Sequence, residues 1–212
     1  MSKSLGLTEE FILLALSKNK RGLFQKSRNL LLVPCVLLIE LIIGGEAHLE
    51  KNKRLYILRS KPSCIKFKEV LIEIICKNKP KKLQGWVSYF SNHPFQKRKI
   101  YNLAMESLIE NGNFEIETGG TGSALKYEVK LNSREKVIQK IRMGLLSDEK
   151  TDDNTLVLTL ILMENRLLKP YFSPEEWKAV KSKLELLKNH SLYNNVRTIG
   201  NRARLIEFAS SV

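Results

Sequence analysis

A chain of 212 residues with a formal net charge of +14 is long enough to bury one sizeable core and carries a large excess of positive charge. Hydrophobic residues make up 43% of the sequence and charged residues 27%, a balance that excludes a largely disordered chain. We therefore expect one folded domain that spans residues 1–212.

The positive charge is concentrated in the N-terminal half. Residues 1–99 contain 20 Lys or Arg and 7 Asp or Glu, a net charge of +13, whereas residues 100–212 contain 16 and 15. A field of one sign over one region attracts polyanions, which in a cell are nucleic acids or the acidic surface of a membrane. Both partners are open at this point, as is the interpretation that the lysines only solvate the surface.

The cysteines and the N-terminus indicate the compartment. Cys35, Cys64 and Cys76 are odd in number and contain no CxxC pair. The sequence therefore predicts neither a disulfide framework nor a zinc site, and it favours a reducing compartment. Glu9 and Glu10 stand directly before the first apolar stretch, with no small-residue cleavage site, which argues against a signal peptide. We expect a cytoplasmic protein.

The most apolar stretch, residues 30–43, is too short to cross a membrane. It has 14 residues, including Pro34 and Glu40, whereas a membrane-spanning helix needs about 20 apolar residues. The stretch predicts a buried core helix, with Pro34 in its first turn and Gly44 and Gly45 as its C-terminal stop. If the protein meets a membrane, we expect it to lie on the surface.

Apolar periodicity predicts helices along the first half of the chain. Thr8 can cap a helix that has Glu9 and Glu10 in its first turn and an apolar stretch at residues 11–16. Apolar residues at positions i, i+3, i+4 and i+7 then predict amphipathic helices near residues 67–75, 83–90 and 100–108.

The second half shows comparable signals. Asn132 and Glu135 resemble a capping pair in front of a further helix, and residues 156–163 form another apolar run. Residues 173–176, with the sequence SPEE, contain the N-cap, the first-position proline and the acid of a capping box. A last helix is predicted over residues 196–208.

Two segments alternate at period two and predict β-hairpins. The first covers residues 47–58 and turns at a basic loop. The second surrounds the glycine-rich loop at residues 119–123. The sequence thus predicts a mainly α fold, a single-domain helical bundle with short β-hairpins, one of which protrudes near residues 113–131.

The sequence contains no motif of a known catalytic or metal site. His48, His93 and His190 are far apart and have no ligand partners at metal-binding spacing. Phosphate-loop, dinucleotide, GxSxG and HExxH patterns are absent. Glu40 within the apolar stretch resembles a general acid with a raised pKa, but a simply paired carboxylate is the plainer interpretation. We expect no enzyme activity, no metal and no cofactor.

Two basic clusters stand beside aromatic residues. The first comprises Lys18, Lys20 and Arg21, with Lys26 and Arg28 downstream, and the second is the run KRK at residues 97–99. Basic side chains that fork around a phosphate, next to an aromatic that can contact a sugar or inositol ring, suit a lipid headgroup or a nucleotide backbone. Either cluster alone is equally consistent with a solvated surface.

The order of several motifs resembles the Golgi phosphoprotein 3 family. These motifs are LTEEFILLAL at residues 7–16, LIEL at residues 38–41 with Gly45, and LIENG at residues 108–112 before the second hairpin. The resemblance implies a mainly helical domain with a protruding hairpin. It also implies phosphatidylinositol 4-phosphate binding and retention of glycosyltransferases at the Golgi, as in eukaryotic members. Frequent Lys, Ile and Asn favour a bacterial relative, in which there is no Golgi.

The family's headgroup site carries over in part. It uses an aromatic residue before the central helix and an arginine at the start of that helix, and these fall at Phe24 or Gln25 and at Pro34. It also uses two arginines on the helix before the second hairpin, of which one is kept as Arg98 and the other becomes Tyr101.

The resemblance and the charge pattern together select a candidate site. We expect the lipid headgroup to contact Phe24, Lys26, Arg28, Lys97, Arg98, Lys99 and Tyr101. The hairpin tip is expected to touch the membrane shallowly, through Gly119, Gly120, Thr121, Gly122, Ser123 and Ala124. The predicted function is that of a peripheral membrane protein that binds acidic headgroups, with membrane-protein tails as further candidate partners.

The alternative is a winged-helix-like regulator that binds nucleic acid. The helix at residues 96–111 and the hairpin at residues 114–131 imitate a recognition helix and its wing. However, the helix turns acidic at Glu106 and Glu110, and the hairpin carries three glutamates against two lysines. Such a surface repels phosphates, so we expect no specific nucleic-acid partner.

Overall fold

The computed structural model describes residues 4–16, 22–58, 63–117, 126–147, 151–186 and 191–210. These parts are mainly helical and contain two short antiparallel hairpins, which confirms the predicted fold class. The first half contains α1 (Leu7–Ala15), α2 (Gly22–Ile43), β1 (Ala47–Leu49), β2 (Leu55–Ile57), α3 (Lys66–Cys76), α4 (Leu83–Asn92) and α5 (Pro94–Glu110). The second half contains β3 (Phe114–Glu117), β4 (Lys126–Val129), α6 (Leu131–Leu146), α7 (Asp153–Glu164), the 3-10 turn η1 (Lys169–Tyr171), α8 (Pro174–Leu186) and α9 (Ser191–Ser210).

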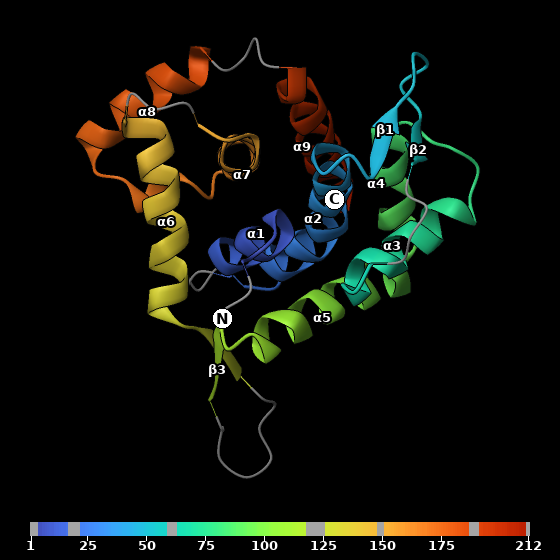
Figure 1. Ribbon diagram of the computed structural model, residues 1–212, viewed down its shortest axis with the longest axis horizontal. Helices are drawn as coiled ribbons and strands as arrows, with labels where there is room; N and C mark the ends of the chain where they lie inside the picture. Colours follow the sequence, from blue (N-terminus) through green and yellow to red (C-terminus); the bar gives the residue numbers. More distant parts are fainter. Residues whose placement is uncertain are drawn as a thin grey trace.

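The core is built around α1 and α2. Both lie at the centre of the molecule, with α3, α4 and α5 on one side and α6, α7 and α8 on the other (Figure 1). Every residue of α1 is buried, as are residues 31–41 of α2 and residues 155–162 of α7. Helices that are apolar on all sides pack inside a protein, so the most hydrophobic stretches of the sequence occupy the interior.

The central helix is longer than the sequence predicted. The apolar pattern placed Pro34 in the first turn, but α2 begins at Gly22, and Pro34 lies well inside it. An internal proline lacks the N–H that would bond to the carbonyl four residues earlier, at a cost of about 3 kcal/mol. Both flanking residues, Val33 and Cys35, are fully buried. Packing on both sides of Pro34 therefore outweighs the local preference for a helix boundary.

The predicted end of α2 is confirmed. Gly45 has a φ of +68°, which favours glycine, and its N–H donates to the carbonyl of Ile42. The N–H of Glu46 donates to the carbonyl of Leu41 at 2.9 Å, which closes the helix and directs the chain into β1. β1 pairs with β2 in the register Ala47 to Ile57, and the first predicted hairpin is thereby confirmed.

The second hairpin follows α5. The helix ends at Asn111 and Gly112 as predicted, and Gly112 has a φ of +69°. β3 and β4 then pair from Phe114 opposite Val129, and β3 leads away from the helices at the bottom of Figure 1. The predicted tip at residues 119–124 lies outside the described residues. The hairpin thus connects the end of α5 to the start of α6, and β3 contacts α5.

The sequence predicted a capping residue at the start of three helices, and one of these three predictions is confirmed. Ser173 and Glu176 form the capping box: the N–H of Ser173 donates to Glu176 Oε2 at 2.8 Å, and the N–H of Glu176 donates to Ser173 Oγ at 3.2 Å. The predictions for Thr8 and Asn132 were wrong, because α1 is capped by Gly6 and α6 begins earlier, after Lys130. The last helix, α9, also extends beyond the predicted residues 196–208.

Asp152 provides a side-chain cap that the sequence analysis did not single out. Its carboxylate accepts the N–H of Thr155 at 3.0 Å and the hydroxyl of the same residue. Partial burial alone would raise the pKa of Asp152, but the hydrogen bonds from Thr155 outweigh it and hold the pKa below its usual range.

Replacing Asp152 by alanine should lower the free energy of unfolding by about 1 kcal/mol at pH 7. Because the folded state lowers the pKa of this carboxyl, its contribution is present above the unfolded pKa and is lost as pH falls through the folded pKa. Urea unfolding of the wild type and Asp152→Ala between pH 7 and pH 3 should therefore show a difference that shrinks with acidity. A difference that stays constant over this range would contradict the role of the ionised cap.

Candidate functional site

The second basic cluster occupies the start of α5. Pro94 is the first residue of the helix, a position that proline favours because its missing N–H has no partner there. Lys97, Arg98 and Lys99 follow within the first two turns. No side chain caps this end of the helix, so its exposed N–H groups and macrodipole add to the positive charge of the three side chains.

The three cations point in different directions. Arg98 and Lys99 are exposed, whereas Lys97 is half-buried and lies near Cys35 of α2. Tyr101, one turn after Lys97, is also half-buried, and burial raises its pKa. The start of α5 therefore presents one exposed basic face and one basic side chain at the junction with α2.

The positive charge at this junction is not neutralised. Within the described ranges no carboxylate forms an ion pair with Lys97, Arg98 or Lys99. Burial and the neighbouring Arg98 guanidinium lower the pKa of Lys97, while burial raises the pKa of the Cys35 thiol to about 12. An anion placed here would relieve the repulsion between Lys97 and Arg98. Helix N-termini commonly bind phosphate groups in this way.

The remaining predicted site residues are only partly placed. Phe24, Lys26 and Arg28 lie on the first two turns of α2, which packs against α5. Their side chains are outside the described part of the structure, so their contact with the α5 cluster stays a prediction. Pro34, where the resemblance places the family's first arginine, is buried. The predicted hairpin contacts at residues 119–124 also lie outside the described residues.

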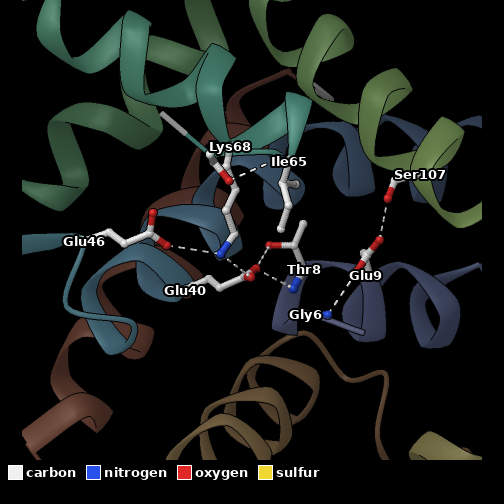
Figure 2. A network of polar contacts seen from close by, with 9 residues as sticks. Gly6, Thr8, Glu9, Glu40, Glu46, Ile65, Lys68 and Ser107 are labelled. Carbon is white, nitrogen blue, oxygen red and sulfur yellow. Dashed lines mark hydrogen bonds and ion pairs between the residues drawn. The ribbon is translucent and has the colours of Figure 1, made fainter. Parts of the chain in front are cut away.

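A buried polar network joins α1, α2 and α3. The sequence analysis did not predict that these residues contact one another. Figure 2 shows the Glu40 carboxylate of α2 between Thr8 and Lys68. Glu40 Oε2 accepts the backbone N–H of Thr8 at 2.9 Å and its hydroxyl at 2.5 Å. Glu40 Oε1 lies 3.1 Å from Lys68 Nζ. The interpretation of Glu40 as a paired carboxylate is confirmed.

Lys68 bridges two carboxylates. Its ammonium group also lies 3.3 Å from Glu46 Oε1, just past the end of α2. Burial alone would lower the pKa of Lys68, but the carboxylates of Glu40 and Glu46 outweigh this effect and raise it. Charge neutralisation of this kind is required for buried ionised groups. Lys68 therefore ties the start of α3 to the end of α2.

The N-terminus of α1 fits closely against this carboxylate. A Cβ atom added at Gly6 would lie 2.6 Å from Glu40 Oε1, so a larger residue would push the carboxylate out of this position. A small cavity of about 210 Å³ adjoins the contact and is lined in part by Glu10, Lys68 and Lys140. The backbone N–H groups at the start of α1 can thus face the negative charge of Glu40 directly.

Glu9 and Glu10 extend the network to two further helices. Glu9 accepts the N–H of Gly6 at 3.0 Å and the hydroxyl of Ser107 on α5 at 2.8 Å. Glu10 lies 3.0 Å from Lys140 of α6, and its burial raises its pKa even though Lys140 opposes the shift. The sequence analysis placed both glutamates in the first turn of the helix and assigned them no partners. The available signal was two acids at the head of a fully apolar segment, where solvent is excluded.

The carboxylates of this network are occupied by structural hydrogen bonds and ion pairs, with the hydroxyls of Thr8 and Ser107 as donors to Glu40 and Glu9. Among the residues that the structure describes, no three His, Cys, Asp or Glu side chains gather as metal ligands would. In the same ranges, each helix is too short or too polar to cross a lipid bilayer.

Replacing Glu40 by alanine should lower the free energy of unfolding by about 3 kcal/mol, near the low end for breaking a buried pair. The change removes the acceptor for Thr8 and one of the two carboxylates at Lys68. The matched control is Glu73→Ala, which removes the exposed ion pair with Lys77 on α3 and should cost less than about 0.5 kcal/mol. If chemical unfolding showed that both variants lose a similar free energy of unfolding, the structural role of Glu40 would be contradicted.

The architecture and the site define a class of protein: a mainly helical domain with a β-hairpin after α5 and a cationic helix end that no carboxylate in the described ranges neutralises. Compared with known protein families, residues 7–199 match Golgi phosphoprotein 3 (GPP34). The chain belongs to this family, as its motif order indicated. The family is associated with phosphoinositide binding and with the Golgi, and it is not known as a family of enzymes. No curated protein matches the sequence significantly.

Proposed function

We propose that this protein is a non-enzymatic peripheral membrane protein that binds acidic phospholipid headgroups, such as phosphatidylinositol 4-phosphate or a similar anionic lipid. The observation that carries the proposal is the run of cations at residues 97–99, which opens α5 without a carboxylate partner in the described part of the chain. Membership of the Golgi phosphoprotein 3 family supports the same conclusion.

The geometry suits a phosphorylated headgroup. Arg98 presents a planar guanidinium that can bond two phosphate oxygens at once, while Lys97 adds a second charge from a half-buried position where solvent screens it less. The uncapped N-terminus of α5 contributes N–H donors. Each basic residue near an acidic membrane contributes roughly 1 kcal/mol. Together with Lys26 and Arg28, the run at residues 97–99 would supply five basic residues. This number lies within the roughly four to six that suffice for binding to an acidic surface.

The nucleic-acid alternative is less well supported. The exposed face of α5 is basic only at its start and carries Glu106 and Glu110 in its second half. A helix that enters the groove of DNA needs basic or neutral side chains along its length. A bilayer surface needs only one end of the helix.

The variant Arg98→Ala should weaken binding to vesicles that contain acidic phospholipid, because it removes the exposed bidentate donor of the run at residues 97–99. Its free energy of unfolding should stay within about 0.5 kcal/mol of the wild type, since an exposed helix position is changed. The matched control, Arg197→Ala on the exposed face of α9, should bind like the wild type. Cosedimentation with acidic and with neutral vesicles measures the binding of each variant. If the wild type bound neutral vesicles as well as acidic ones, the proposal would be contradicted.

A side-by-side titration separates the two classes of partner. DNA binding is expected to be weak, independent of sequence and lost at about 0.15 M salt, because it depends on charge alone. Binding to acidic vesicles should persist at that ionic strength, because lipid contacts add apolar burial to charge. Tight, sequence-selective binding to duplex DNA under these conditions would favour the winged-helix alternative instead.

A further inference from the structure

Phe95, the second residue of α5, is the most exposed large hydrophobic residue in the described part of the structure. Its exposed fraction is 83%, and Pro94 beside it is exposed as well. The core-facing side of the same helix is formed by Ile100, Ala104 and Leu108, each fully buried. Phe95 therefore points away from the core and contributes nothing to packing.

Phe95 shares its face of the helix with two unneutralised cations. Arg98 and Lys99 follow three and four residues later, the spacing that brings side chains together on a helix surface. Both are exposed, and neither pairs with a carboxylate in the described ranges. The first acidic residue on this face is Glu106, two turns further along. The patch therefore combines an aromatic ring with uncompensated positive charge.

A single exposed hydrophobic residue is ordinary and by itself indicates nothing. Leu186 is the comparison: it is 75% exposed at the end of α8, but Lys183, three residues before it on the same face, is half-buried and donates to the carbonyl of Ser147. The exposed pair of cations that accompanies Phe95 is not repeated there. Phe95 is distinguished by the charge around it, which complements phosphate groups, while the ring itself prefers the layer below them.

We propose that Phe95 inserts into the interfacial layer of an acidic lipid bilayer while Arg98 and Lys99 contact the phosphates above it. This inference rests on the proposed function and adds an apolar contact to it. It also places the insertion on α5, whereas the sequence analysis expected shallow membrane contact through the hairpin tip at residues 119–124.

The two kinds of contact differ in their response to salt. Counterions weaken the contribution of Arg98 and Lys99, but they leave the transfer of an aromatic ring into lipid almost unchanged. Phe95→Ala should therefore raise the Kd for acidic vesicles about tenfold at each salt concentration, with an unchanged salt dependence. Arg98→Ala should make the salt dependence shallower.

The insertion can be observed directly with Phe95→Trp. Vesicles of phosphatidylcholine and phosphatidylserine are prepared with ordinary or with brominated acyl chains, since bromine quenches indole fluorescence only at close range. Trp86 is fully buried and Trp177 half-buried, so the wild type gives the background. Phe95→Trp should show quenching well above it. Two variants of Leu186 serve as matched controls. Leu186→Trp should show only background quenching, and Leu186→Ala should bind with wild-type affinity.

The outcomes separate this inference from the proposed function. If the wild type binds acidic vesicles but Phe95→Ala binds equally well and Phe95→Trp is quenched no more than the wild type, the inference fails while headgroup binding stands. If the wild type does not bind acidic vesicles, both fail. Preserved thermal unfolding of the variants confirms that any loss of affinity arises at the surface.

Discussion

The buried carboxylate of Glu40 is the interaction on which the arrangement of the N-terminal helices depends. Glu40 accepts two hydrogen bonds from Thr8 and pairs with Lys68, so one side chain of α2 fixes both α1 and α3. A buried charge is costly unless its partners are held in place, and this one sits against the N-terminus of α1, where the helix macrodipole favours it. A side chain at Gly6 would displace this carboxylate from its place.

This junction also sets the position of the candidate lipid site. Glu9 bonds to Ser107 in the last turns of α5, while the first turns of α5 pack beside α2 near Cys35. The helix is thus held along its length, and its basic N-terminus lies at the surface, where none of the described carboxylates pairs with it. Burial of acids at one place and exposure of cations at another are two consequences of the same packing.

Helices with a clear apolar face, such as α3 and α4, were predictable because periodicity depends on local sequence alone. The capping box at Ser173 and the stop at Gly45 were predictable for the same reason. Thr8 and Pro34 were not, because tertiary packing decided each: Thr8 bonds to Glu40 on another helix, and Pro34 stays inside a helix because its neighbours Val33 and Cys35 are buried in the core. At the site, sequence identified the charges of residues 97–99 but could not tell that Lys97 faces α2 and Arg98 faces solvent.

The central claim is that an anionic headgroup binds where Lys97 and Arg98 meet. Lys97 reports on it directly, because burial and Arg98 lower its pKa in the free protein. An NMR titration of the lysine side-chain signals, with and without short-chain phosphatidylinositol 4-phosphate, gives this pKa in both states. Bound phosphate should raise the pKa of Lys97 and shift the backbone signals at the start of α5, while the backbone signals around the exposed Lys178 of α8 should not move. Unchanged signals at Lys97 with saturating lipid would contradict the account.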